Sequence, residues 1–321
     1  MPTAVVSTVV PVYAAGMRRP LCLLWALCVV ACAGPGRPVD PVRSPSRDWN
    51  AIVAADYRVP PGEEALPVLL ELDEVLGDRD SHRRDDCGYG IAVQWLLRQR
   101  LVDPAGLRQL RDRWLANLQR GLGEVGTDTV LRRSFSALCL SVLAARDLQT
   151  SFLDAAEVRA LLDRAVTYLR DERDLRDHEP EVGWIHATAH TADLLKFLAR
   201  NPQLDAAGLT TILDAIAAKL AVPMPGAFRM GEDERLARAV LAVVRRNEHD
   251  AEAFVAFVAR VVASIDAARR CEPFAAQQFA VEQNGLHCLR TLHTLLATAG
   301  ELPPQAERAL QVLAKQLAVL G

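Results

Sequence analysis

Two histidines and an aspartate at helical spacing are the residues best placed to do chemistry. His186, His190 and Asp193 occupy positions i, i+4 and i+7 of the run from Gly183 to Leu195. Successive residues of an α-helix are about 100° apart, so these three fall within roughly 60° of one another. The pattern predicts one stripe with two imidazoles and a carboxylate among mostly apolar neighbours. Such a stripe is either a polar network in a helical core or a functional site.

A divalent metal ion is the first ligand that this stripe could hold. One helical turn between two histidines allows both imidazoles to bind one ion, with Asp193 as a third ligand or as an acceptor that orients a histidine. The zinc-protease pattern HExxH requires glutamate after the first histidine, where this chain has Ala187. One hypothesis is therefore a metal-dependent or hydrolase-like enzyme of another kind, with its remaining ligands on other helices.

Charged and aromatic residues near the stripe complete the candidate polar site. They are Trp184, Asp174, Arg176, Glu232, Asp233, Glu234 and Arg235. Each also has a purely structural interpretation. The tryptophan could lie in the core, and the acidic run could simply begin a helix. The arginines could lie on the surface, or pair with Asp193 or with the acidic run. The chain has no Gly-x-Ser-x-Gly elbow, phosphate loop or dinucleotide fingerprint. Because no complete catalytic set can be written, the sequence favours a binding or scaffold module over the enzyme.

Helices must position these residues, and from Glu63 onward the sequence predicts one helix after another. Capping residues such as Asp103 before Pro104, and Asp154 with Glu157, mark helix starts. The predicted helices span residues 104–121, 127–146, 154–172, 182–199, 205–221, 232–246, 250–270, 274–299 and 304–320. No strand patterns stand out. We predict an all-α fold of stacked antiparallel helix pairs, either an armadillo/HEAT-like α-solenoid or a globular helical array.

The N-terminal segment predicts export and lipid attachment. A basic start at Met17-Arg18-Arg19 precedes an apolar stretch, and Val29-Val30-Ala31-Cys32 resembles the bacterial lipobox, in which the cysteine is lipidated. We predict a signal segment at residues 1–32 with its true start at Met17, a Pro-rich tether at 33–61 and a single all-helical domain at 62–321. An ordinary cleaved signal or an uncleaved anchor is the alternative. Ala33 after the cysteine favours the outer membrane, facing the periplasm.

The net charge and the N-terminal cysteine indicate which kinds of partner to expect. The chain has 37 Lys and Arg against 40 Asp and Glu, a formal net charge of −3, so no nucleic-acid partner is expected. The expected partners are the membrane, through Cys32, and a protein, peptide or envelope component.

An exported protein can form disulfides, and Cys271 with Cys288 is the most plausible pair by proximity. Cys139, on a very apolar helix, is expected to be a buried small hydrophobe.

Three motifs resemble those of the bacterial domain-of-unknown-function 2785 family. They are the run from Gly183 to Asp193, residues 171–176 and residues 231–237. The resemblance covers residues 65–320. It implies an all-helical domain in a group with no established activity. The chain departs from the family after Arg176, where Asp177 stands in place of the usual glycine, so the resemblance does not imply the local loop geometry there.

Overall fold

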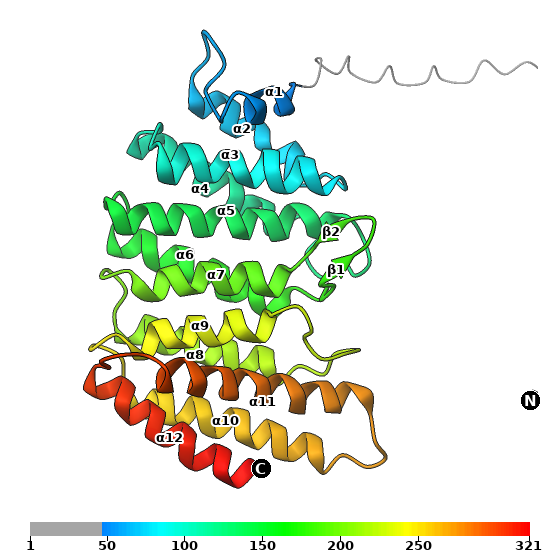
Figure 1. Ribbon diagram of the computed structural model, residues 1–321, viewed down its shortest axis with the longest axis vertical. Helices are drawn as coiled ribbons and strands as arrows, with labels where there is room; N and C mark the ends of the chain where they lie inside the picture. The colour runs from blue at the N-terminus through cyan, green and yellow to red at the C-terminus, as the bar shows by residue number, and fades with distance from the viewer. Residues whose placement is uncertain (1–46) are drawn as a thin grey trace, which may run out of the picture. The chain divides into compact units, whose positions relative to one another are not determined.

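Helices are the main secondary structure of the computed structural model, which describes residues 47–321 (Figure 1). The predicted signal segment, the lipobox at Cys32 and residues 33–46 of the predicted tether lie outside these residues. The α-helices are α1 (Trp49–Ala54), α2 (Ala65–Val75), α3 (Gly90–Ala92), α4 (Pro104–Asn117), α5 (Thr129–Gln149), α6 (Ala155–Asp171), α7 (Ala187–Arg200), α8 (Ala206–Leu220), α9 (Glu232–Val244), α10 (Ala251–Arg269), α11 (Ala276–Ala297) and α12 (Pro304–Leu320). The predicted all-α fold is confirmed.

Two π-helical segments and a short hairpin complete the secondary structure. The segments η1 (His82–Tyr89) and η2 (Val93–Arg98) flank α3 and continue its course. Strands β1 (His178–Glu179) and β2 (Gly183–Trp184) pair in antiparallel fashion, with His178 opposite Trp184. Within residues 47–321, no helix combines the length and apolar character needed to cross a membrane.

Local capping interactions explain where several helices begin. The Asp103 carboxylate accepts a hydrogen bond from the Gly106 N–H at 2.8 Å, and Pro104 occupies the first helical position. Asp154 and Glu157 bond each other's backbone N–H groups in a capping box at the start of α6. These contacts confirm the starts expected for both helices.

The helices pack in two rows. Helices α5, α7, α9 and α11 contact one another in succession, and α6, α8, α10 and α12 contact one another in the same way as a second row (Figure 1). Contacts between α4 and α5, α6 and α7, α8 and α9, and α10 and α11 join the rows. Consecutive helices thus pack as pairs that stack on their neighbours. The assignment of this stack to the α-solenoids stays a prediction.

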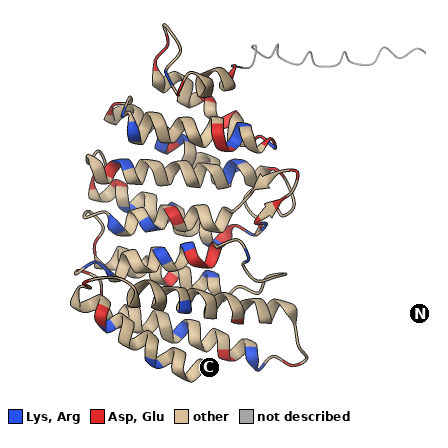
Figure 2. Ribbon diagram, in the orientation of Figure 1, with Lys and Arg blue, Asp and Glu red and all other residues tan. Residues whose placement is uncertain are grey.

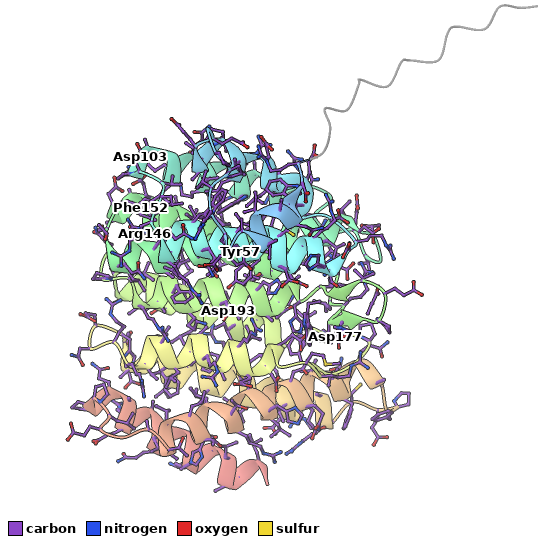
Figure 3. The ribbon with its side chains drawn as sticks, turned by 45° about the horizontal axis from the view of Figure 1, so that its top comes forward. Tyr57, Asp103, Arg146, Phe152, Asp177 and Asp193 are labelled. Atoms are coloured by element: carbon purple, nitrogen blue, oxygen red, sulfur yellow. The ribbon has the colours of Figure 1, made fainter. Side chains whose placement is uncertain are left out.

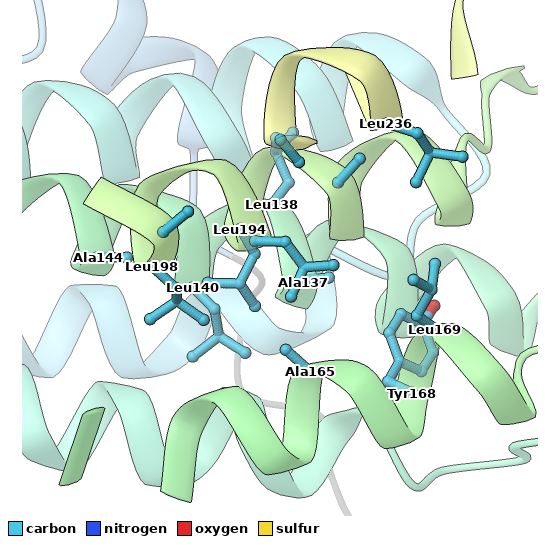
Figure 4. Packing of buried hydrophobic residues seen from close by; sticks show 14 of the residues in the cluster. Ala137, Leu138, Leu140, Ala144, Ala165, Tyr168, Leu169, Leu194, Leu198 and Leu236 are labelled. Carbon is cyan, nitrogen blue, oxygen red and sulfur yellow. The ribbon is translucent and has the colours of Figure 1, made fainter. Parts of the chain in front are cut away.

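Helix α5 lies at the centre of the hydrophobic core. Sixteen of its 21 residues are buried, so its whole circumference is in contact with other elements. Leu140 and Ala144 of α5 pack beside Leu194 and Leu198 of α7, and Ala165 of α6 lies opposite (Figure 4). Full burial of one leucine contributes about 1.5–3 kcal/mol. Polar side chains that α5 carries must therefore be satisfied inside the core.

The structure corrects the expected start of the histidine helix. Residues 178–184, expected partly within a helix from residue 182, form the hairpin, and α7 begins only at Ala187. Gly183 has φ +78° and His186 has φ +50°, and neither value belongs to a right-handed helix. Pro180 lies in the turn between the strands, where its fixed φ suits the second turn position. Backbone conformation here overrides the helical spacing of the side chains.

The predicted disulfide is also wrong. The four cysteines among residues 47–321, namely Cys87, Cys139, Cys271 and Cys288, are all free thiols. Cys288 is buried on α11, while Cys271 lies in the connection between α10 and α11 and is partly exposed. Cys139 is completely buried in the core, as expected. Closeness in the sequence did not place the two cysteines in bonding distance.

Candidate functional site

A row of aromatic rings runs from the surface into the core at the hairpin end of α7. The ring centroids of His178 and Trp184 are 4.7 Å apart, and those of Trp184 and His186 are 4.4 Å apart. The row continues through His190, 5.9 Å from His186, to Phe135 at 4.9 Å. The hairpin positions the outer rings, whereas α7 and α5 position the inner ones. Trp184, a residue of the predicted polar site, is 41% exposed, so the alternative interpretation that placed it in the core is wrong.

His186 and Glu232 form a buried pair beneath Trp184. His186 precedes the first turn of α7 in the left-handed conformation, and Glu232 is the first residue of α9. Glu232 Oε1 lies 3.1 Å from His186 Nε2. The distance suits an ion pair, but the direction is not that of a hydrogen bond, so this buried nitrogen has no hydrogen-bond partner among the described residues. The two side chains therefore interact through their charges and not through a directional hydrogen bond.

The charge of Glu232 is favoured at this position. Burial by itself would raise the pKa of its carboxyl group, but contact with His186 and with backbone N–H groups at the start of α9 outweighs burial, and the pKa lies below its ordinary value. One of these N–H groups belongs to Met230, which donates at 3.1 Å. The carboxylate also lies at the positive end of the α9 dipole. We therefore treat Glu232 as ionised at neutral pH.

His190 belongs to a closed polar network in the core. The Ser134 hydroxyl donates to the Ile185 carbonyl and lies 2.8 Å from His190 Nδ1. A hydroxyl has one proton, so Nδ1 must carry the other proton and donate to Ser134. Burial and the neighbouring His186 and Arg235 hold the pKa of His190 well below its ordinary value. The imidazole is therefore neutral and holds the start of α7 against α5.

Asp193 is separate from the two histidines. Its carboxylate accepts from Lys196 Nζ at 2.6 Å and from the Arg235 guanidinium. Figure 3 labels Asp193 in the middle of the helical layer, away from the hairpin beside Asp177. Because residue 186 precedes α7, the spacing i, i+4, i+7 does not describe one helical face. The three predicted ligands are not assembled, and residues 47–321 contain no group of three or more His, Cys, Asp or Glu side chains that could hold a metal ion.

Asp174 and Arg176 stabilise a loop instead of forming part of this site. Arg176 donates to the buried Asp174 carboxylate at 2.8 Å and to the carbonyl of Thr127 at 2.8 Å. Asp174 also accepts from the backbone N–H of Gly126 at 2.9 Å. These bonds connect the segment after α6 to the segment before α5. Arg176 thus pairs neither with Asp193 nor with the acidic run, which was one of the alternatives open from the sequence.

The remaining acidic candidates point in different directions from the start of α9. Asp233 Oδ2 lies 3.6 Å from His287 Nδ1 on α11, and burial raises the pKa of Asp233. Glu234 pairs with Arg238 one turn later at 2.6 Å, as an ordinary surface contact. Of the three acidic residues, only Glu232 reaches the aromatic row. The prediction that this run opens a helix is confirmed.

Sequence reasoning missed Arg84 and Asp85 in η1. The Arg84 guanidinium is completely buried, lies over the Phe135 ring at 4.7 Å and donates to the carbonyls of Val182 and Trp184. Burial raises the pKa of the adjacent Asp85 carboxyl to about 6. The only signal in the sequence was a dense charged run from Asp78 to Asp86, and π-helical turns of this kind are frequent at functional sites.

We define the hairpin site as Asp85, His178, Trp184, His186 and Glu232. Asp85 lies in η1, His178 and Trp184 lie in the hairpin, His186 directly precedes α7, and Glu232 begins α9. Two carboxylates, two imidazoles and one exposed indole allow it to bind a ligand through charge, hydrogen bonds and ring contacts.

The chain shares its central part with one protein family. The family model described as "Protein of unknown function (DUF2785)" matches residues 118–294. This range contains every residue of the hairpin site except Asp85, together with all of α5 to α10. No curated protein and no solved structure matches the chain.

Proposed function

We propose that this chain, which belongs to the DUF2785 family, is a binding or scaffold module of the bacterial cell envelope. Its ligand would be a protein, peptide or envelope component, held at the hairpin site. The lipidated Cys32 and the Pro-rich segment after it would tether the helical domain to the membrane, at the outer membrane facing the periplasm.

The exposure of Trp184 above an unsatisfied histidine carries this proposal. The indole is 41% exposed, while the His186 side chain directly beneath it is only 4% exposed and its Nε2 has no hydrogen-bond partner among the described residues. Exposed tryptophans are frequent energetic centres of binding surfaces, since one ring offers a large apolar area together with an N–H donor. A ligand that covered Trp184 would remove this apolar surface from water.

A hydrolase-like enzyme is the second candidate, and the contact between Ser134 and His190 is the observation that favours it. Nucleophilic catalysis requires an unprotonated imidazole nitrogen that faces the hydroxyl. Here the hydroxyl donates to the Ile185 carbonyl, and His190 Nδ1 carries a proton toward Ser134. Ser134 is also completely buried. The binding module therefore agrees better with the geometry.

Comparison of variants of the full-length chain would test the binding function. The protein is immobilised and exposed to detergent-solubilised bacterial envelope, and retained components are quantified by mass spectrometry. Trp184→Ala should lose at least about 90% of the specifically retained material, as expected for an energetic centre of about 1.4 kcal/mol or more. Phe279→Ala removes an aromatic side chain of similar exposure, 46%, elsewhere and serves as the matched control. Equal retention by Trp184→Ala and the unmodified chain would refute a ligand at this site.

Two further measurements test the remaining parts of the proposal. Incorporation of an alkyne-labelled fatty acid should be lost in Cys32→Ser and kept in Cys28→Ser, with a matching shift from the membrane to the soluble fraction. Labelling that survives Cys32→Ser would contradict the tether. Turnover of a retained component that disappears in Ser134→Ala would instead support the enzyme.

A further inference from the structure

We infer that the hairpin site takes a cationic group, an ammonium or a guanidinium, between the Trp184 indole and the Asp85 carboxylate. This inference rests on the proposed function, because it names the chemical class of the ligand that the site would bind. A basic peptide segment is the ligand that fits it best.

Asp85 is a carboxylate without a committed partner. Its side chain is 32% exposed, and no hydrogen bond to it exists among residues 47–321. The nearest basic atom, Arg84 Nη2, lies 3.8 Å away. That nitrogen already donates to the Val182 carbonyl at 2.7 Å and to the Trp184 carbonyl at 3.0 Å, and Nη1 donates to the Asp78 carbonyl at 2.8 Å. The directional bonds of Arg84 thus go to the backbone, and Asp85 keeps its capacity to accept.

The aromatic side of the site suits the same class of ligand. Arg84 Nη2, beside Asp85, bonds the backbone carbonyl of Trp184, and His178, whose ring packs on the indole, is close enough to act on the charge of Asp85. His178 packs edge-on against the indole, and both side chains are exposed. A cation over an indole face gains about 0.5–1 kcal/mol at an exposed site. An exposed ring beside an accessible carboxylate thus offers two independent attractions for one positive charge.

The floor of the site contains a carboxylate oxygen that can still accept. Glu232 Oε1 lies 3.1 Å from His186 Nε2, but the direction is not that of a hydrogen bond, and the backbone N–H of Met230 donates to the other oxygen, Oε2. No hydrogen bond to Oε1 exists among residues 47–321, so an N–H group of a ligand that reached this pair would find an acceptor there. This carboxylate points to a ligand rich in donors, as an ammonium or guanidinium is.

The charge around the hairpin disfavours an anionic ligand. Figure 2 shows acidic residues on the hairpin and at the beginning of α9. An anion would meet Asp85 and Glu232, while the basic residue closest to the site, Arg84, is buried and bonded to carbonyls. Arg229 is already paired with Asp177 at 3.0 Å, and Arg176 with Glu179 of the hairpin at 3.0 Å. Electrostatic complementarity therefore selects a positive ligand.

Acid should weaken the binding. The pKa of Asp85 is about 6, raised by burial in spite of Arg84, so the carboxylate is charged at pH 7.5 and largely protonated at pH 5. The other charged groups that act on it are Asp86 and His178. Asp86→Asn should keep the loss of affinity between pH 7.5 and pH 5, and Asp85→Asn should abolish it.

Three capped tripeptides provide the test with the full-length chain. Acetylated and amidated tri-arginine, tri-serine and tri-glutamate are titrated at pH 7.5 and low salt, with calorimetry and intrinsic tryptophan fluorescence as readouts. Tri-arginine should bind at least about tenfold more tightly than the other two. Asp85→Asn should weaken it about tenfold, while Asp86→Asn, which removes an adjacent exposed charge paired with His82, should change it less than about twofold. Circular dichroism verifies that each variant is folded.

The outcomes separate the two proposals. Equal binding of tri-serine and tri-arginine, or preference for tri-glutamate, would overturn the cationic class but keep the binding site. Absence of tri-arginine binding would also overturn the cationic class, and the proposed function would stand if Trp184→Ala still loses its envelope component. If Trp184→Ala loses none of the retained material but tri-arginine binds and depends on Asp85, the site exists and its assignment to an envelope partner fails.

Discussion

Replacement of Gly183 by alanine should destabilise the protein through two separate effects. Gly183 has φ +78°, where an L-residue with a Cβ costs about 1–2 kcal/mol. An added Cβ would also lie 2.8 Å from Ser81 Cβ, an atom that cannot move without the backbone of the segment leading into η1. Forced shifts of this kind cost about 1–3 kcal/mol. The two together predict a loss of about 2–5 kcal/mol in the free energy of unfolding, with displacement of Trp184.

Two other glycines provide matched controls. Gly123 has φ +91° with nothing within 4 Å of an added Cβ, so Gly123→Ala should show the backbone cost alone, about 1–2 kcal/mol. Gly226 has neither a positive φ nor a close neighbour, and its replacement should change stability by less than about 1 kcal/mol. Urea unfolding followed by circular dichroism measures all three. If Gly183→Ala costs no more than Gly123→Ala, the close approach of the hairpin to η1 is refuted.

Three further outcomes follow from the buried polar groups. Arg133→Met should lower the free energy of unfolding by about 3–5 kcal/mol, because it leaves the buried Glu172 carboxylate, 2.6 Å away, without its partner. Arg238→Met, at the exposed pair with Glu234, should lower it by less than about 1 kcal/mol. Equal losses of stability in thermal unfolding would contradict the role of burial. Because the pKa of His190 is lowered in the folded protein, its imidazole takes up a proton below pH 6.5 only in the unfolded chain. The free energy of unfolding should therefore fall by up to about 1.4 kcal/mol per pH unit toward pH 5, and His190→Gln should reduce that slope. A maleimide reagent should label Cys271 in the folded protein and leave Cys139 unmodified, because Cys139 is buried and burial raises the pKa of its thiol. Equal labelling of the two cysteines, measured by mass spectrometry, would contradict this prediction.

The buried pair of Arg133 and Glu172 shows how the family motif around residues 171–176 acts in the fold. Glu172 follows α6 and holds Arg133 of α5 through two hydrogen bonds at 2.6 and 3.1 Å. Its carbonyl accepts from the buried Lys219 of α8 at 3.0 Å, and burial lowers the pKa of that lysine to about 8. Three helices thus meet at one carboxylate residue. The motif therefore supports the frame that carries the hairpin site, from outside the site itself.

Most of the helical architecture could be read from the sequence alone. Periodic apolar residues, the capping box at Asp154 and the acidic start at Glu232 each act within one or two helical turns, and such local signals depend little on the rest of the chain. The burial of Cys139 followed in the same way from its apolar helix. The polar character of the region around His186 and His190 was also evident, as was a contact between Arg235 and Asp193 as one alternative.

The tertiary structure alone decided which polar residues meet. The strands of the hairpin have two residues each, too few for a periodic signal, and the left-handed conformation of His186 breaks the helical spacing that joined it to Asp193. Arg84 bonds a carbonyl 98 residues away, and its partners are backbone atoms with no identity in the sequence. Spacing within one helix is determined by backbone geometry, whereas the meeting of Asp85, Trp184 and Glu232 depends on how separate elements pack. Packing of that kind is a property of the whole folded chain, and no segment of it contains the information by itself.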